Sequence, residues 1–129
     1  MRLRPACPHE IDDTVTVLVV VLDNDLRVLI KRILEASGCR VLVAANETEA
    51  FELANSTEID LLLTEATPLI HGPAIAERFR ARTPVLPVLY VTDHPGLRDL
   101  DGEKILEKPF SREDLTRAIA SVRPEQPES

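Results

Sequence analysis

The sequence has few cysteines and no long hydrophobic segment. Its two cysteines, Cys7 and Cys39, do not have the spacing of a metal site, and we expect them to be reduced thiols. The apolar run from Val15 to Leu22 is interrupted by Thr16 and is too short to cross a membrane. No apolar core of a signal peptide follows the basic first residues. These absences predict a cytoplasmic protein without a disulfide or a membrane segment.

Positive charge is also scarce. Lysine and arginine number 15 against 22 aspartate and glutamate residues, which gives a formal net charge of -7. A surface that binds nucleic acid needs a basic face, and no local cluster of lysine and arginine supplies one. We therefore expect no nucleic-acid partner.

The length of 129 residues predicts one domain with its own hydrophobic core. Residues 1–13 contain two prolines and predict a flexible leader, residues 14–123 predict the folded domain, and residues 124–129 predict a polar tail. The sequence contains no internal repeats. A single domain framed by polar ends is the expected organisation.

Apolar segments of strand length alternate with amphipathic segments of helix length. Seven of the eight residues from Val15 to Leu22 are apolar and mostly β-branched, which is typical of a strand buried on both faces. Further strands are predicted at Val41–Ala45, Leu61–Glu65, Val88–Thr92 and Lys104–Glu107. Strands that alternate with helices through short loops predict a parallel sheet covered by helices on both sides.

The ends of the predicted helices are marked by residues that satisfy backbone groups left without helical partners. Capping residues and proline mark the starts, and glycine in the left-handed conformation marks an end. These residues are Asn24 or Asp25 for the first helix, which ends at Gly38, Asn46 with Glu49 for the second, Pro73 for the third, and Ser111 with Asp114 for the last. Residues 93–103 have room for a weak helix at best.

Four polar residues follow strands of the predicted sheet. Asp23, Glu65, Thr92 and Lys108 each lie where a strand ends, and open α/β sheets place their sites at this edge. The simplest interpretation is an ion pair between Glu65 and Lys108, with Thr92 capping a turn. Taken alone, these residues predict a polar cluster and no particular reaction.

The order of motifs resembles the receiver domains of bacterial response regulators and hybrid histidine kinases, over roughly residues 15–123. The motifs are VLVV, DLRVLIKRILEASGCRV, DLLLT followed by an acid, HGP, LPVLYVT and ILEKPFSREDL. The resemblance implies a flavodoxin-like (βα)5 doubly wound parallel sheet of strand order 2-1-3-4-5. It implies a shortened fourth helix, because the segment between Thr92 and Lys108 is short. It also implies a cis bond between Lys108 and Pro109.

In this family an aspartate at the end of the third strand accepts a phosphoryl group from a phosphohistidine. A magnesium ion, held by an acid pair after the first strand, neutralises the incoming charge. A threonine and a lysine hold the phosphoryl oxygens. By resemblance, Thr92 matches the switch threonine and Lys108 matches the lysine.

The remaining site positions depart from the family pattern. The acid pair falls on Val21 and Leu22, the phosphoacceptor on Glu65, and the switch aromatic on Ile105. Hydrocarbon side chains cannot bind a cation that requires oxygen, and glutamate moves the carboxylate outward by one methylene. The resemblance therefore implies a degenerate receiver with no catalytic residue, metal or cofactor. It would dock a signalling protein such as a histidine kinase or a regulator, and a homodimer is also considered.

Two alternatives remain open at this stage. The chain could be a working phosphoacceptor that uses Glu65, or that uses Asp23 as a Mg²⁺ ligand after a shift of one residue. It could also be a small flavodoxin-like enzyme or flavin carrier, but the loop VLDNDLR lacks the glycines of a phosphate-binding loop. Glu65 near Lys108 either mimics a phosphorylated aspartate in part or forms an ordinary ion pair of small energetic value.

Overall fold

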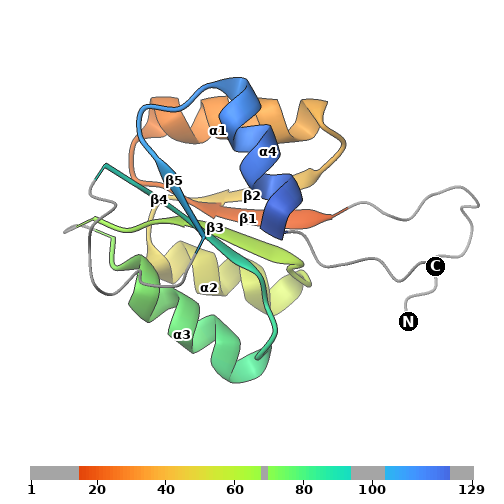
Figure 1. Ribbon diagram of the computed structural model, residues 1–129. Helices are drawn as coiled ribbons and strands as arrows, with labels where there is room; N and C mark the ends of the chain where they lie inside the picture. Colours follow the sequence, from red (N-terminus) through yellow and green to blue (C-terminus); the bar gives the residue numbers. More distant parts are fainter. Residues whose placement is uncertain (1–14, 68–69, 94–103, 123–129) are drawn as a thin grey trace, which may run out of the picture.

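The computed structural model describes residues 15–67, 70–93 and 104–122 of the chain. Its centre is a sheet of five parallel strands in the order β2-β1-β3-β4-β5 (Figure 1). The strands are β1 (Thr16–Val20), β2 (Arg40–Ala44), β3 (Leu61–Glu65), β4 (Val88–Thr92) and β5 (Lys104–Glu107). This order confirms the predicted flavodoxin-like fold.

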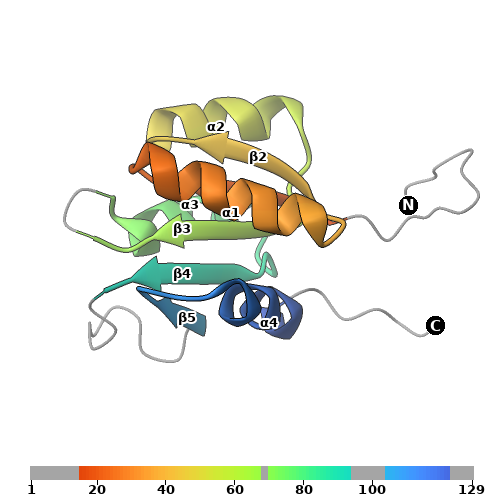
Figure 2. The ribbon, with the colours of Figure 1, turned by 90° about the horizontal axis from the view of Figure 1, so that it is seen from above.

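The described residues form four helices, which cover both faces of the sheet. They are α1 (Asn24–Ala36), α2 (Glu47–Ser56), α3 (Gly72–Arg82) and α4 (Arg112–Val122). Helices α1 and α4 lie on one face, and α2 and α3 lie on the other (Figures 1 and 2). Within the described ranges, no helix is long and apolar enough to pass through a bilayer.

The sheet separates two hydrophobic clusters. Because successive side chains of a strand point to opposite faces, Val17 and Val19 pack on the α1 and α4 side while Leu18 and Val20 pack on the α2 and α3 side. Every residue of β1, β3 and β4 is buried, as expected for central strands of a parallel sheet. Burial on both faces fixes the register of these strands and with it the alignment of their carboxyl ends.

Predicted boundaries of β1, β2 and α1 were wrong. Strand β1 ends at Val20, so Val21 and Leu22 belong to the following loop, and β2 begins one residue earlier than predicted and ends at Ala44. The N-cap of α1 is Asp23, not Asn24 or Asp25. Its side chain accepts a hydrogen bond from the amide of Asp25 at 3.1 Å, because the helix already begins at Asn24.

Most other helix boundaries agree with prediction. Glu49 donates its amide to the side chain of Asn46 at the start of α2, and Ser111 and Asp114 bond reciprocally before α4. Gly38 has a φ of 96° after α1, and the bond before Pro109 is cis. The predicted leader and tail, and the shortened fourth helix expected before β5, lie outside the described residues.

Candidate functional site

The carboxyl ends of the strands meet at one edge of the sheet, which Figure 2 shows from above. Glu65 is the last residue of β3, Thr92 is the last residue of β4, and Lys108 directly follows β5. In the strand register Glu65 is paired with Val91. The structure therefore brings together the polar residues that the sequence placed at strand ends, apart from the exposed cap residue Asp23.

Glu65 has a buried carboxylate with a partner on each oxygen. Its side chain is only 5% exposed, and Oε2 lies 2.7 Å from the Nζ atom of Lys108. Oε1 accepts a hydrogen bond of 2.8 Å from the backbone amide of Leu22. One carboxylate thus joins β3 to the loop after β1 and to the segment after β5.

Lys108 is tied to the sheet at both its backbone and its side chain. Its amide donates to the carbonyl oxygen of Thr92 at 2.9 Å, and its side chain, 24% exposed, reaches Glu65. Hydrogen bonds between charged partners are shorter and stronger than neutral ones, and partial removal from water reduces their screening. The predicted pair of Glu65 and Lys108 is confirmed, in a more buried setting than an ordinary surface salt bridge.

The positions equivalent to the acid pair carry no oxygen ligand in their side chains. Val20 pairs with Thr64, so Val21 stands one step further along beside Glu65, and Val21 is fully buried. The side chain of Leu22 is 47% exposed, although its amide faces Glu65. A buried valine and an exposed leucine supply no side-chain oxygen for a hard divalent cation at these two positions.

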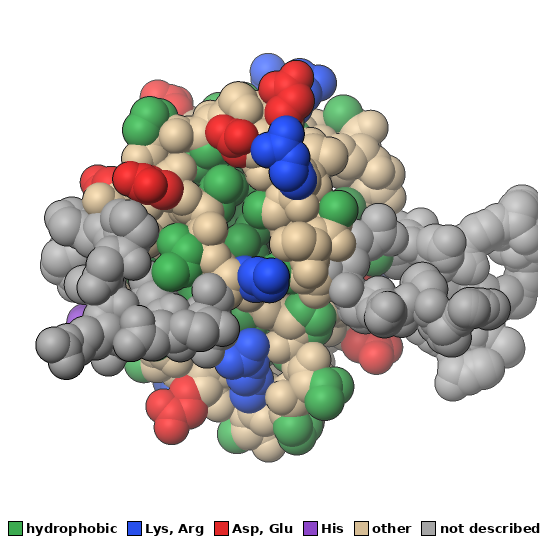
Figure 3. Space-filling view, viewed as in Figure 1, with side chains coloured by type: hydrophobic (Ala, Val, Ile, Leu, Met, Phe, Trp, Pro, Cys, Tyr) green, Lys and Arg blue, Asp and Glu red, His purple; other side chains and the backbone are tan. Residues whose placement is uncertain are grey.

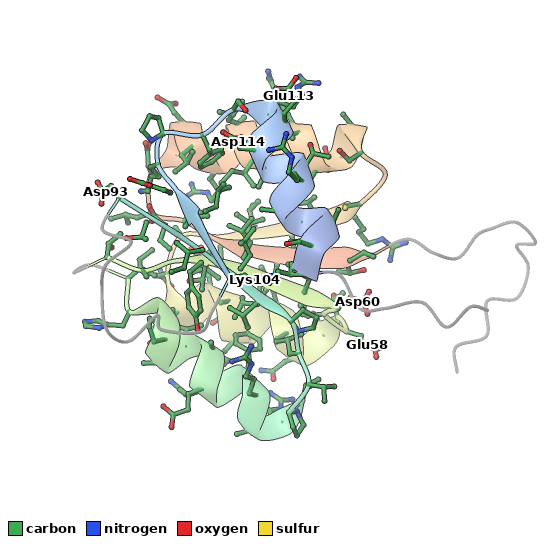
Figure 4. All side chains as sticks on the ribbon, viewed as in Figure 1. Glu58, Asp60, Asp93, Lys104, Glu113 and Asp114 are labelled. Atoms are coloured by element: carbon green, nitrogen blue, oxygen red, sulfur yellow. The ribbon has the colours of Figure 1, made fainter. Side chains whose placement is uncertain are left out.

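Other acidic side chains do not replace the missing pair. Asp23 is exposed and caps α1, while Glu58 and Asp60 lie at the far end of the strands from Asp93 (Figure 4). The carboxylate of Asp60 instead accepts a bond from the amide of Thr16 at 2.9 Å. Across the residues that can be described, no three His, Cys, Asp or Glu side chains gather in a way that could hold a metal ion. The residues present do not fit a Mg²⁺ site.

Thr92 and Ile105 are the residues that the resemblance matches to the switch positions. Thr92 is fully buried, and its Oγ1 atom donates to the carbonyl oxygen of Ala66 at 2.8 Å. Ile105 is half-buried, pairs in register with Tyr90, and packs in the cluster on the α2 and α3 side. Isoleucine at this position has no aromatic ring.

Gly72 lies close behind Glu65 at the start of α3. A Cβ atom at this position would lie 2.4 Å from the carbonyl oxygen of Glu65 and 3.1 Å from Cδ1 of Tyr90. Glycine therefore allows α3 to approach the end of β3. This close approach explains the glycine of the HGP sequence in physical terms.

The contacts of Arg27 and of the Leu22 amide were not predicted from the sequence. The guanidinium of Arg27 donates to the carbonyl oxygens of Val21 and Leu22 and to Oδ1 of Asn24. The only signal in the sequence was an asparagine three residues before an arginine, which is a common helical spacing. Backbone groups of the loop, which no residue type reveals, complete the surroundings of Glu65.

Basic and hydrophobic side chains share the face of the molecule on which β5 and α4 lie. Figure 3 shows lysine and arginine near the middle of this face, with acidic side chains mostly towards its rim. Lys104, at the start of β5, lies on this face in Figure 4. On this face, basic side chains therefore lie more centrally than acidic ones.

Comparison with protein families shows a match over residues 17–120 to the response regulator receiver domain. Among characterised proteins, the chain is 30% identical over 107 residues to the response regulator receiver protein CpdR of Brucella abortus. This match covers 78% of the chain and 89% of CpdR. The chain is also 31% identical to the DNA-binding transcriptional regulator NtrC of Escherichia coli, over 82% of the chain but only 24% of NtrC.

Solved structures of similar fold include the chemotaxis response regulator CheY4 of Vibrio cholerae, with a TM-score of 0.76 and 23% identity. That comparison covers 84% of the chain and 98% of CheY4. A response regulator receiver domain from Clostridium thermocellum gives a TM-score of 0.71 with 28% identity, over 84% of the chain and 93% of the other. The likeness to CheY4 concerns the fold alone.

Proposed function

Because the chain belongs to the receiver domain family of response regulators, we propose that it is an atypical receiver that acts without accepting phosphate. In this role it is a protein-interaction module of two-component signalling, with no catalytic residue of its own. The observation that carries the proposal is the state of Glu65, whose two carboxylate oxygens are bound by Lys108 and by the Leu22 amide.

Phosphoryl transfer to a carboxylate needs an oxygen that can attack in line and a cation that neutralises the incoming charge. Glu65 carries one methylene more than the aspartate of the family, which displaces its oxygens. Val21 and Leu22 provide no cation ligands, and the ammonium of Lys108 is already paired. These features support a site in which the family's phosphate chemistry is lost.

The ion pair also suggests which state the module adopts. A buried carboxylate against Lys108 provides one fixed negative charge at the end of β3. This charge partly mimics a phosphorylated aspartate and holds the loops after β1 and β5 together. We therefore propose a receiver that stays in one conformational state, and whose interactions do not depend on a phosphorylation cycle.

The partner in this proposal is a signalling protein, such as a histidine kinase or a regulator, in the cytoplasm. A second copy of the chain is also considered as a partner. Nucleic acid stays excluded as a partner on the ground of net charge, a prediction that the structure does not test.

The proposal is tested by incubating the full chain with Mg²⁺ and acetyl phosphate, and separately with Mg²⁺ and beryllofluoride. We expect no mass increase in the intact protein and no change in the amide resonances of residues 21–23, 65, 92 and 108. A receiver domain with a complete acid pair serves as the positive control. A stoichiometric adduct on Glu65 or Asp23 would contradict the proposal and establish a working phosphoacceptor.

A further inference from the structure

The side chain of Arg27 binds the loop between β1 and α1 from the side of the helix. Its Nη1 atom donates to the carbonyl oxygens of Val21 at 2.8 Å and of Leu22 at 3.2 Å. Its Nη2 atom donates to Oδ1 of Asn24 at 2.9 Å. The backbone amide of Arg27 also donates to the carbonyl oxygen of Asp23, so the residue is anchored in the helix while its side chain folds back over the loop.

One of these partners, the carbonyl group of Val21, belongs to the peptide group that also contacts Glu65. A planar peptide group joins Val21 to Leu22, and its carbonyl and N–H point in opposite directions. Arg27 binds the carbonyl end at 2.8 Å, and Oε1 of Glu65 binds the N–H end at 2.8 Å. A guanidinium and a carboxylate therefore lie at opposite ends of one peptide group.

We propose that Arg27 is a positioning residue for Glu65 and acts through the peptide group between Val21 and Leu22. A cationic donor at the carbonyl polarises the peptide, which strengthens its N–H as a donor to the carboxylate. The same contact fixes the plane of the peptide and aims the N–H at Oε1. This inference rests on the proposed function, since it explains how the Glu65 carboxylate is held.

The role requires a guanidinium rather than any cation. Arg27 spreads its bonds over three separated acceptors, two backbone carbonyls and the Asn24 side chain. A guanidinium presents its donors in a planar fork, whereas the ammonium of lysine offers all its donors from one nitrogen. Lysine at this position can therefore restore some of these hydrogen bonds, but not all three.

The test follows the amide of Leu22 by NMR in the full chain. In Arg27→Gln we expect the proton resonance of this amide to move upfield and its hydrogen exchange to speed up by about ten-fold, as for the loss of a charge-assisted bond. Arg27→Lys should show a smaller change in the same direction. Arg32→Gln, at an exposed arginine of the same helix, should leave the Leu22 amide unchanged.

A purely structural role of Arg27 predicts a different result. It would change the amides of α1 evenly, and the effects of Arg27→Gln and Glu65→Met on Leu22 exchange would multiply as independent effects, since methionine removes the acceptor of the Leu22 amide. Action through the peptide predicts that Arg27→Gln has little further effect once Glu65 is replaced. If Arg27→Gln does not fold, Arg27→Lys with Glu65→Met gives the same comparison.

The outcome is separable from that of the proposed function. If Glu65→Met moves the Leu22 resonance but Arg27→Gln and Arg27→Lys do not, the inference about Arg27 is wrong, while the hydrogen bond between the Leu22 amide and Glu65 stands. A phosphoryl adduct on Glu65 would instead overturn the proposed function. That adduct would not alter the response of the Leu22 amide to Arg27→Gln measured without phosphate.

Discussion

The Nζ atom of Lys108 lies 2.7 Å from Oε2 of Glu65, although the two residues are 43 positions apart in the sequence. The pair joins the end of β3 to the segment after β5, across the end of β4. Glu65 is buried and is also bound by the Leu22 amide. Removing one partner of this pair should therefore cost more free energy of unfolding than removing one partner of an exposed ion pair.

Removing the ammonium should therefore destabilise the fold. In Lys108→Met the carboxylate of Glu65 stays buried with one partner fewer, and we expect the free energy of unfolding to fall by about 2–3 kcal/mol. Urea denaturation measures this loss. The double variant Lys108→Met with Glu65→Gln should recover much of it, because no buried charge is then left unpaired.

The exposed pair of Lys31 and Glu35 provides a matched control. It has a similar distance, 2.8 Å, but its side chains are 41% and 45% exposed. Lys31→Met should cost only about 0.5 kcal/mol, as expected for exposed helix pairs. Equal losses in Lys108→Met and Lys31→Met would mean that the Glu65 pair has no special weight.

The contact between Gly72 and the end of β3 predicts a second sensitive position. Gly72→Ala places a Cβ atom 2.4 Å from the carbonyl oxygen of Glu65, so either α3 or the end of β3 must shift. We expect a loss of about 1–3 kcal/mol in the free energy of unfolding, as for other overpacked sites. Thermal denaturation and the amide resonance of Leu22 report the shift.

Gly38→Ala separates crowding from backbone strain. Gly38 has a φ of 96°, and nothing lies within 4 Å of an added Cβ atom. Its substitution should cost about 1 kcal/mol through backbone conformation alone and leave the Leu22 amide unchanged. A shift of the Leu22 amide in Gly38→Ala but not in Gly72→Ala would contradict this interpretation.

The comparison between sequence and structure shows where pattern analysis is reliable. The bounds of β4 were predicted correctly because Pro87 directly precedes the strand and Thr92 is the last residue before a charged one. The end of β1 was predicted too late, because Val21 and Leu22 are equally apolar and yet one is buried and the other is 47% exposed. Hydrophobicity identifies a strand but does not locate the residue at which it leaves the sheet.

The candidate site shows the same limit. Glu65 and Lys108 were predicted to meet because both follow parallel strands, and topology alone aligns such ends. The Leu22 amide and Arg27 were not predicted, since their roles depend on the direction of one peptide plane and on a side chain that folds back towards the preceding loop. Neither the direction of a peptide plane nor the conformation of a side chain can be predicted directly from residue types.

The cap of α4 predicts a dependence of stability on pH. A hydrogen bond from the Ser111 backbone amide, followed by one from the Ser111 side chain, lowers the pKa of Asp114 below its ordinary value of 3.8. The folded state therefore favours the ionised carboxylate. Its contribution is complete above the ordinary pKa and is lost as the pH falls through the lowered value.

Asp114→Asn removes this titration. We expect wild type to be more stable than the variant near neutral pH, and the difference to shrink as the pH is lowered below 3.8. Urea denaturation at a series of pH values measures it. Glu113→Gln, at an exposed acid of the same helical turn, should show a much weaker dependence of this stability difference on pH. An equal dependence in both variants would mean that the cap is not its cause.

The last prediction concerns the phosphate chemistry that we propose the site has lost. Thr92 and Lys108 are still in place, so the variant Val21→Asp, Leu22→Asp, Glu65→Asp should regain a cation site and a shorter carboxylate. Without a metal we expect it to be less stable than wild type, because Val21 is fully buried and its replacement adds an unpaired charge. Added Mg²⁺ should raise its melting temperature but not that of wild type.

In the presence of Mg²⁺ and acetyl phosphate, the triple variant should gain the mass of one phosphoryl group at residue 65. If burial of Asp at position 21 prevents folding, the variant Leu22→Asp with Glu65→Asp keeps Val21 and changes an exposed side chain instead. A folded variant that binds Mg²⁺ but takes no phosphate would show that Thr92 and Lys108 no longer hold the geometry for transfer. The proposed loss of phosphoryl transfer would then depend on more residues than those at positions 21, 22 and 65.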